Sequence, residues 1–179
     1  MVTGEGADAK APYRRLSVMF ARALPPASAG SALVAGVGSF LAIGALITLD
    51  GLLSIALLIA PFGASCVLIF ALPSAPLAQP ANVVFGHAVS AGAGLLVIAA
   101  LPDFAWSPAL GVGLAVAAMV LLRVTHPPAG ANPIVVSLLD PGWLFVLVPV
   151  LLGAVALVLI GVAFHRVTGK PYPVRVHPR

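Results

Sequence analysis

Five long stretches of this chain are apolar and almost free of charge, and they limit what it can fold into more than any other feature. The stretches are residues 31–49, 52–72, 82–101, 109–139 and 143–164. About 20 apolar residues suffice for a helix to cross the hydrocarbon core of a bilayer. The whole chain is 61% hydrophobic and 8% charged, whereas soluble domains are roughly 45–50% apolar and about 25% charged. The sequence therefore predicts an all-α fold, a polytopic transmembrane helical bundle whose main partner is the lipid bilayer.

The positions of the basic residues predict how this bundle is threaded. All Lys and Arg except Arg123 lie in the two terminal segments, and positively charged flanks stay in the cytoplasm. Both termini are then cytoplasmic, which requires an even number of crossings. The fourth stretch is too long for one ordinary span and short for two, so we expect six crossings, two of them short or broken, or four plus re-entrant pieces.

This threading divides the chain into three parts. We expect a cytoplasmic N-terminal leader over 1–28, a single transmembrane domain over 29–165 and a cytoplasmic basic tail over 166–179. The leader lacks the apolar core and cleavage site of a secretory signal peptide. Because the net charge of +4 is explained by topology, we expect no nucleic-acid partner. A stripe of small residues, Gly86, Ser90 and Gly94, indicates close helix packing and also allows a homo-oligomer.

A faint internal repeat has an offset of 67 residues. The pattern Pro-x-Gly-Ala occurs at Pro61 and again at Pro128, and the pair Gly86 and Gly94 matches Gly153 and Gly161. Chance matches in a chain rich in Gly and Ala are the alternative. If the repeats are real, they cover about 31–101 and 109–164, and with three spans each they must be inverted, which is a common plan of transporters.

Prolines interrupt two of the apolar stretches. A helix cannot continue through Pro127 and Pro128, although a new one can begin there, and Pro61 has the same effect in the first half. Each new half-helix would begin with unpaired amides, whose partial positive charge attracts a compact anion. We expect these residues to bind it: Phe62, Gly63, Ala64 and Ser65 in the first half, and Ala129, Gly130, Ala131 and Asn132 in the second.

Three ionisable residues inside the apolar stretches are further candidates, because a buried charge requires a partner or a watery cavity. Arg123 and His126 share a face if their turn is helical, which would place a fixed positive charge beside a titratable imidazole. His126 and His87 could together form a proton pathway. The alternatives are that Arg123 reaches to the headgroups and that both histidines make structural hydrogen bonds.

Enzyme and metal signatures are absent from the sequence. It contains no His pair at metal-ligand spacing, phosphate-binding glycine loop or nucleophile elbow. The single cysteine, Cys66, excludes an intrachain disulfide and a cysteine-rich metal site. We expect neither enzymatic activity nor a cofactor or metal.

Three sequence motifs carry a resemblance to a known family. The string from His126 to Pro133 (HPPAGANP), with APFGAS at Ala60 and PSAPLAQPAN at Pro73 upstream, strongly resembles the HPP family of integral membrane proteins over about 31–164. The family is usually described with four transmembrane segments, and its cyanobacterial and chloroplast members are associated with nitrite transport. The resemblance implies a bacterial plasma (inner) membrane protein that transports nitrite or a similar small anion. A non-transporting scaffold or regulatory subunit is the alternative.

Overall fold

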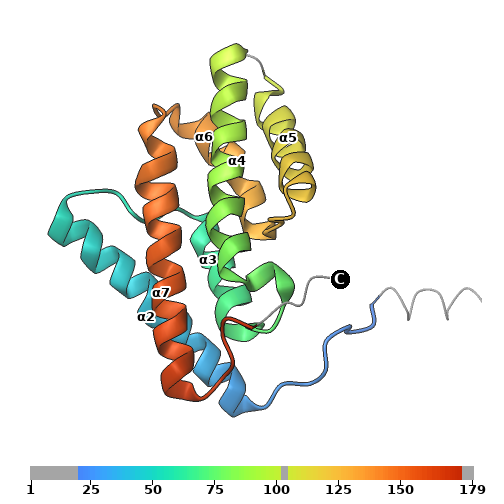
Figure 1. Ribbon diagram of the computed structural model, residues 1–179, viewed down its shortest axis with the longest axis vertical. Coiled ribbons are helices and arrows are strands. Elements are labelled where there is room, and N and C mark those ends of the chain that lie inside the picture. The colour runs from blue at the N-terminus through green and yellow to red at the C-terminus, as the bar shows by residue number, and fades with distance from the viewer. Residues whose placement is uncertain (1–19, 102–104, 175–179) are drawn as a thin grey trace, which may run out of the picture.

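The computed structural model describes residues 20–101 and 105–174, and all regular structure in these ranges is helical (Figure 1). Most of the expected N-terminal leader and the last residues of the basic tail lie outside this range. The longer helices are α2 (Ala29–Leu53), α4 (Pro80–Ala100), α5 (Ser107–Leu121) and α7 (Leu152–Thr168). The shorter elements are α3 (Pro61–Cys66), continued by the π-helical η1 (Val67–Ala71); η2 (Pro76–Ala78); η3 (Pro127–Ala131), continued by α6 (Asn132–Leu139); and η4 (Val146–Leu151), which leads into α7.

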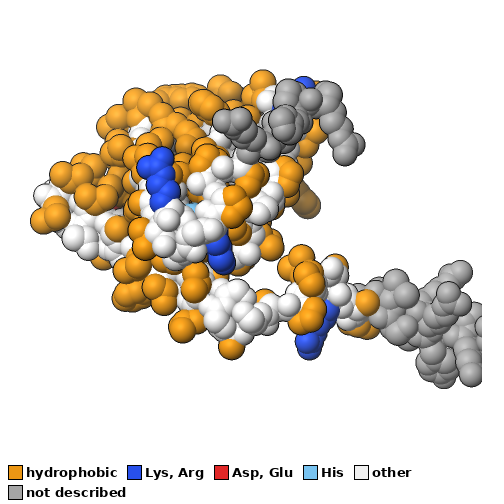
Figure 2. Space-filling view, turned by 60° about the horizontal axis from the view of Figure 1, so that its bottom comes forward, with side chains coloured by type: hydrophobic (Ala, Val, Ile, Leu, Met, Phe, Trp, Pro, Cys, Tyr) orange, Lys and Arg blue, Asp and Glu red, His pale blue; other side chains and the backbone are white. Residues whose placement is uncertain are grey.

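The surface is apolar, as a bilayer requires. Three helices, Ala29–Leu53, Pro80–Ala100 and Val146–Thr168, are long and apolar enough to cross a membrane by length and composition. Large apolar side chains such as Phe40 and Leu138 are more than three-quarters exposed, and Figure 2 shows hydrophobic atoms over much of the visible face. Exposure on this scale is costly in water. The chain is therefore a multi-pass helical membrane protein, and the expected six crossings would use these three helices, α5 and the two broken segments.

Both expected helix breaks are confirmed. α2 ends before Ser54, which has a left-handed backbone (φ 52°), and helix resumes only at Pro61. On the other side α5 ends at Leu121, and His126 is extended (φ −135°, ψ 102°) before η3 begins at Pro127. A following proline disfavours the helical conformation, which agrees with the extended backbone of His126, and proline lacks the amide hydrogen that would continue a preceding helix.

The two halves of the chain run in opposite directions. α4 and α7 contact each other and are antiparallel (Figure 1). The start of α2 and the end of α7 lie at the bottom of that view, and the end of α4 lies at the top. In Figure 2 this bottom end is turned toward the reader, and basic side chains are visible on it. The cytoplasmic side was predicted from this distribution of basic residues.

Glycines allow the long helix of each half to cross the broken segment of the other half. A Cβ added at Gly86 of α4 would lie 2.8 Å from the Val124 carbonyl oxygen, and one at Gly153 of α7 would lie 2.7 Å from that of Leu57. Both pairs of positions, 86 with 153 and 57 with 124, differ by the repeat offset of 67. The two crossings are thus made at equivalent positions, and the expected small-residue stripe serves helix packing.

Candidate functional site

A cluster of four polar side chains lies inside the bundle. Ser65 comes from α3, His87 from α4, His126 from the extended segment before η3, and Asn132 from the start of α6. All four are 0% exposed. Buried polar groups are stable only when they are hydrogen-bonded, so their partners define what the cluster can do. We call these four residues the polar cluster.

Ser65 is the centre of the polar cluster. Its Oγ lies 2.9 Å from Nε2 of His87 and 2.8 Å from Nε2 of His126. The two imidazole rings stand edge to face with centroids 5.1 Å apart. The other ring nitrogen of His126, Nδ1, donates to the main-chain carbonyl of Leu77 at 2.8 Å. One serine hydroxyl thus joins two histidines, and one of them is tied to the loop before α4.

Asn132 completes the other end of the polar cluster. Its Nδ2 donates to the His87 main-chain carbonyl at 2.9 Å and lies 3.1 Å from His87 Nδ1. The rings of Phe62 and His87 form a T-shaped pair with centroids 5.0 Å apart. This side of His87 is therefore closed by one amide and one aromatic ring.

Two further hydrogen bonds fix the second broken segment against α4. The Ser90 hydroxyl donates to the Ala129 carbonyl, and Asn82 Nδ2 donates to the Thr125 carbonyl at 2.9 Å. Gly86 lies between these two residues and allows the backbone before His126 to approach. α4 thereby sets the position of both histidines.

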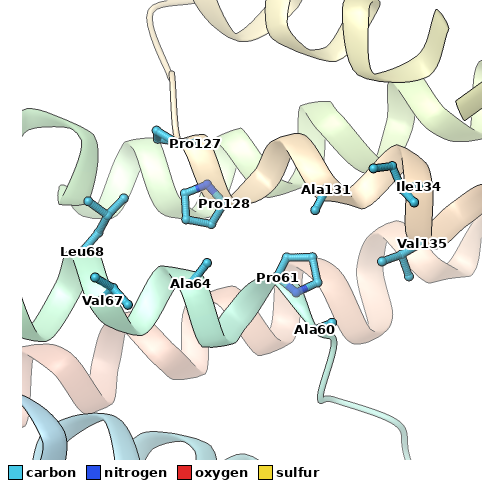
Figure 3. A pocket seen from close by; sticks show the side chains of 10 residues that line it. All are labelled: Ala60, Pro61, Ala64, Val67, Leu68, Pro127, Pro128, Ala131, Ile134 and Val135. Carbon is cyan, nitrogen blue, oxygen red and sulfur yellow. The ribbon is translucent and has the colours of Figure 1, made fainter. Parts of the chain in front are cut away.

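An apolar groove of about 760 Å³ lies between the two antiparallel half-helices (Figure 3). Each wall contributes five residues, and every residue on one wall is paired with the residue 67 positions later on the other. The lining residues are Ala60, Pro61, Ala64, Val67 and Leu68 on one wall, and Pro127, Pro128, Ala131, Ile134 and Val135 on the other. Ala64 and Ala131 line the groove, whereas the next residues, Ser65 and Asn132, belong to the polar cluster. The half-helices therefore separate an apolar groove from a polar interior.

The structure brings together Ser65, His87, His126 and Asn132, but it contradicts the expectation for Arg123. Its turn is not helical, because α5 ends at Leu121 and Arg123 itself has a left-handed backbone (φ 61°). Arg123 is exposed, and His126 is fully buried. The prediction that the two side chains share one face is wrong.

The expectation of unpaired amides at the half-helix starts is also wrong for Phe62, Gly63 and Ala129. The N–H groups of Phe62 and Gly63 donate to the carbonyls of Ile59 and Ala60 at 3.0 and 3.2 Å, and that of Ala129 donates to His126 at 3.0 Å. These short turns supply the carbonyl partners that the sequence argument assumed to be missing. The two starts also point in opposite directions, because the half-helices overlap antiparallel.

Sequence analysis missed one participant, the Leu77 carbonyl. A main-chain acceptor carries no side-chain signal, and only the fold brings it to His126. Among the described residues, no group of three or more His, Cys, Asp or Glu side chains is placed to hold a metal ion.

Comparison with known proteins identifies the family of this chain. Residues 24–173 match the family described as HPP, transmembrane region. Two transmembrane proteins of Dictyostelium discoideum are each 36% identical to it, over 125 and 126 residues. The aligned regions cover 65% of this chain but only 44% and 40% of those proteins, so the chain spans less than half the length of these relatives. No solved structure matches it. By the extent of the family match, the chain belongs to the HPP transmembrane family.

Proposed function

We propose that this protein transports a small anion across the membrane, with nitrite as the best candidate. The observation that carries the proposal is the groove whose two walls are built from residues 67 positions apart on antiparallel half-helices. Broken helices that meet at the interface of inverted repeats are the usual location of transporter binding sites. We accordingly propose that residues of about 31–101 and 109–164 are inverted repeats.

The polar cluster is the proposed place where the anion is recognised. A compact anion inside a bilayer needs hydrogen-bond donors or positive charge. Of the amides first expected to supply the donors, those of Phe62, Gly63 and Ala129 are paired, and the groove lining is apolar. Ser65 and Asn132 can donate hydrogen bonds, and His87 or His126 becomes cationic on taking up a proton. Nitrite is chosen because of the resemblance to nitrite-transporting members of the family.

Flux into liposomes tests the proposal. The purified protein is reconstituted, and nitrite entry is followed with and without a pH gradient. We expect protein-dependent entry that falls at least tenfold in His126→Ala. Arg123→Ala is the matched control, because it removes an exposed charge three residues away and should leave most of the flux. Vesicles with folded protein and no nitrite entry in either condition would contradict the proposal.

The second candidate is a non-transporting scaffold or regulatory subunit of the membrane. It is favoured by one observation, the complete burial of the polar cluster, which fits a core that stays closed. The same flux measurement separates the two candidates, because a scaffold would give no nitrite entry above that of empty vesicles.

A further inference from the structure

We propose that Asn132, His87, Ser65 and His126 form a hydrogen-bonded chain of one polarity that passes a proton between the interior of the bundle and the loop at Leu77. This hydrogen-bonded chain would couple proton movement to anion transport, and that coupling role rests on the proposed function. It uses two histidines that come from different halves of the molecule. Their direct link is the Ser65 hydroxyl.

The polarity of the chain follows from its fixed end. The Leu77 carbonyl can only accept, so Nδ1 of His126 carries the hydrogen of their 2.8 Å bond. Nε2 of a neutral His126 is then a lone pair, and the Ser65 hydroxyl donates to it. This tautomer is assigned from its hydrogen-bond partners.

The remaining links are then determined in turn. Ser65 has one hydroxyl hydrogen, and we assign it to His126 at 2.8 Å because the other acceptor, the Pro61 carbonyl, is farther away at 3.3 Å. The Ser65 oxygen then accepts from Nε2–H of His87 at 2.9 Å. Nδ1 of His87 is therefore a lone pair, and the Asn132 amide donates to it at 3.1 Å. All the hydrogen bonds therefore donate in the same direction, from Asn132 toward Leu77, and all four side chains are neutral in the resting state.

Proton transfer along this chain conserves atoms and charge. The Asn132 amide must first turn so that its Oδ1, 3.4 Å from His87 Nδ1, replaces the amide hydrogen there. A hydronium ion on the interior side then protonates Nδ1, and the imidazolium releases its Nε2 proton to Ser65 Oγ. Ser65 passes its own proton to Nε2 of His126, and the Nδ1 proton of His126 passes to a water molecule beside the Leu77 carbonyl. One proton enters, one leaves, and every group is again neutral.

The transfer also couples the proton to the loop. After it, Nδ1 of His126 and the Leu77 carbonyl would be two acceptors facing each other, which is unfavourable. The chain resets only when a proton returns or when the loop moves. The Gln79 side chain holds that loop, because its Nε2 donates to the main-chain carbonyls of Pro73 and Ala75. The main-chain N–H of Val174, in the C-terminal segment, donates to Gln79 Oε1 at 2.9 Å.

Other titratable groups lie on the elements around the polar cluster but are not linked to it. Cys66 follows Ser65 in α3, and Arg123 is exposed. His165 of α7 donates to the Ile69 carbonyl at 2.8 Å. None of these forms a hydrogen bond with the polar cluster among the described residues.

Nuclear magnetic resonance of histidine nitrogens tests the chain independently of transport. In lipid nanodiscs, the wild-type protein should show hydrogen on Nε2 of His87 and on Nδ1 of His126. Ser65→Ala should slow the exchange of the His87 ring hydrogen with water at least tenfold, and Ser65→Thr, which retains the hydroxyl, should restore much of it. Ser137→Ala is the matched control, since the Ser137 hydroxyl donates to a carbonyl of its own helix. The opposite tautomers, or equal exchange in wild type and Ser65→Ala, would overturn the proposal.

A second measurement separates this proposal from the transport function. Vesicles containing a pH indicator are given an inward nitrite gradient, and proton and nitrite entry are recorded together. We expect both to enter with the wild-type protein and proton entry to fall at least tenfold with Ser65→Ala. Nitrite entry without protons would overturn the coupling role and leave transport intact. If no nitrite enters while the nitrogen spectra show the linked exchange, the transport function fails and the proton chain stands.

Discussion

At the scale of single residues, the close approach at Gly86 predicts a sharp difference between two glycines of α4. A Cβ at Gly86 would lie 2.8 Å from both the Val124 carbonyl oxygen and the His126 Cβ, whereas one at Gly92 would meet nothing within 4 Å. Overpacking of this kind costs about 1–3 kcal/mol. Gly86→Ala should therefore lower the free energy of unfolding in detergent by about that amount.

Gly92→Ala is the control for this prediction. Replacing an unhindered helical glycine with alanine stabilises a helix by up to about 1 kcal/mol, so this variant should unfold at equal or higher denaturant concentration. Equal stability of the two variants would show that the His126 segment does not pack on α4 as described. Gly86→Ala should also impair function, because a displaced His126 loses its contact with Ser65.

At the scale of elements, the C-terminal segment after α7 fastens the loop before α4. The buried Tyr172 hydroxyl donates to the Ala78 carbonyl at 3.0 Å, and a neutral hydrogen bond contributes about 1 kcal/mol. Tyr172→Phe should lower the unfolding free energy by roughly that amount at neutral pH. Denaturant unfolding followed by circular dichroism measures the change.

The same tyrosine predicts a pH dependence. Burial raises the pKa of Tyr172, so above the ordinary tyrosine pKa of about 10 the unfolded chain releases a proton that the folded chain retains. Because the unfolded state then binds fewer protons, the unfolding free energy falls as pH rises through and above that value. Tyr172→Phe should lack this part of the decrease. An identical pH slope in both proteins would contradict the burial of this hydroxyl.

At the scale of the whole molecule, the antiparallel halves predict which segments share a membrane face. In a Cys66→Ala background, Ser28→Cys and Thr168→Cys should react with an impermeant maleimide from the same side of oriented vesicles, because α2 starts and α7 ends at the same end. Ala105→Cys, near the start of α5, should react from the other side. Labelling of positions 28 and 168 from opposite sides would contradict the arrangement in Figure 1. Wild-type Cys66, 2% exposed, should resist the reagent.

The helix breaks were predictable, but the surroundings of the residues near them were not. Pro61 and Pro127 each begin a new helical segment, because the fixed φ of proline suits the first helical position and its missing amide hydrogen is not needed there. Whether Arg123 and His126 share a face depends on where α5 ends and how the following segment packs against Gly86. These are contacts between distant segments, and a short-range spacing rule cannot include them. The pairing of the Phe62, Gly63 and Ala129 amides likewise depends on turns that the chain adopts only in its folded state.

The sequence by itself determined that the protein lies in a lipid bilayer, that its fold is all-helical and that helices are interrupted before Pro61 and Pro127. Water-free surroundings force backbone groups to pair within a helix, and proline removes one donor wherever it stands. Only the tertiary structure decided which polar groups meet, because Ser65 is 22 residues from His87 and 61 from His126. Their contact depends on helix crossings at glycines from both halves of the chain, and so does the separation of the apolar groove from the polar cluster behind it.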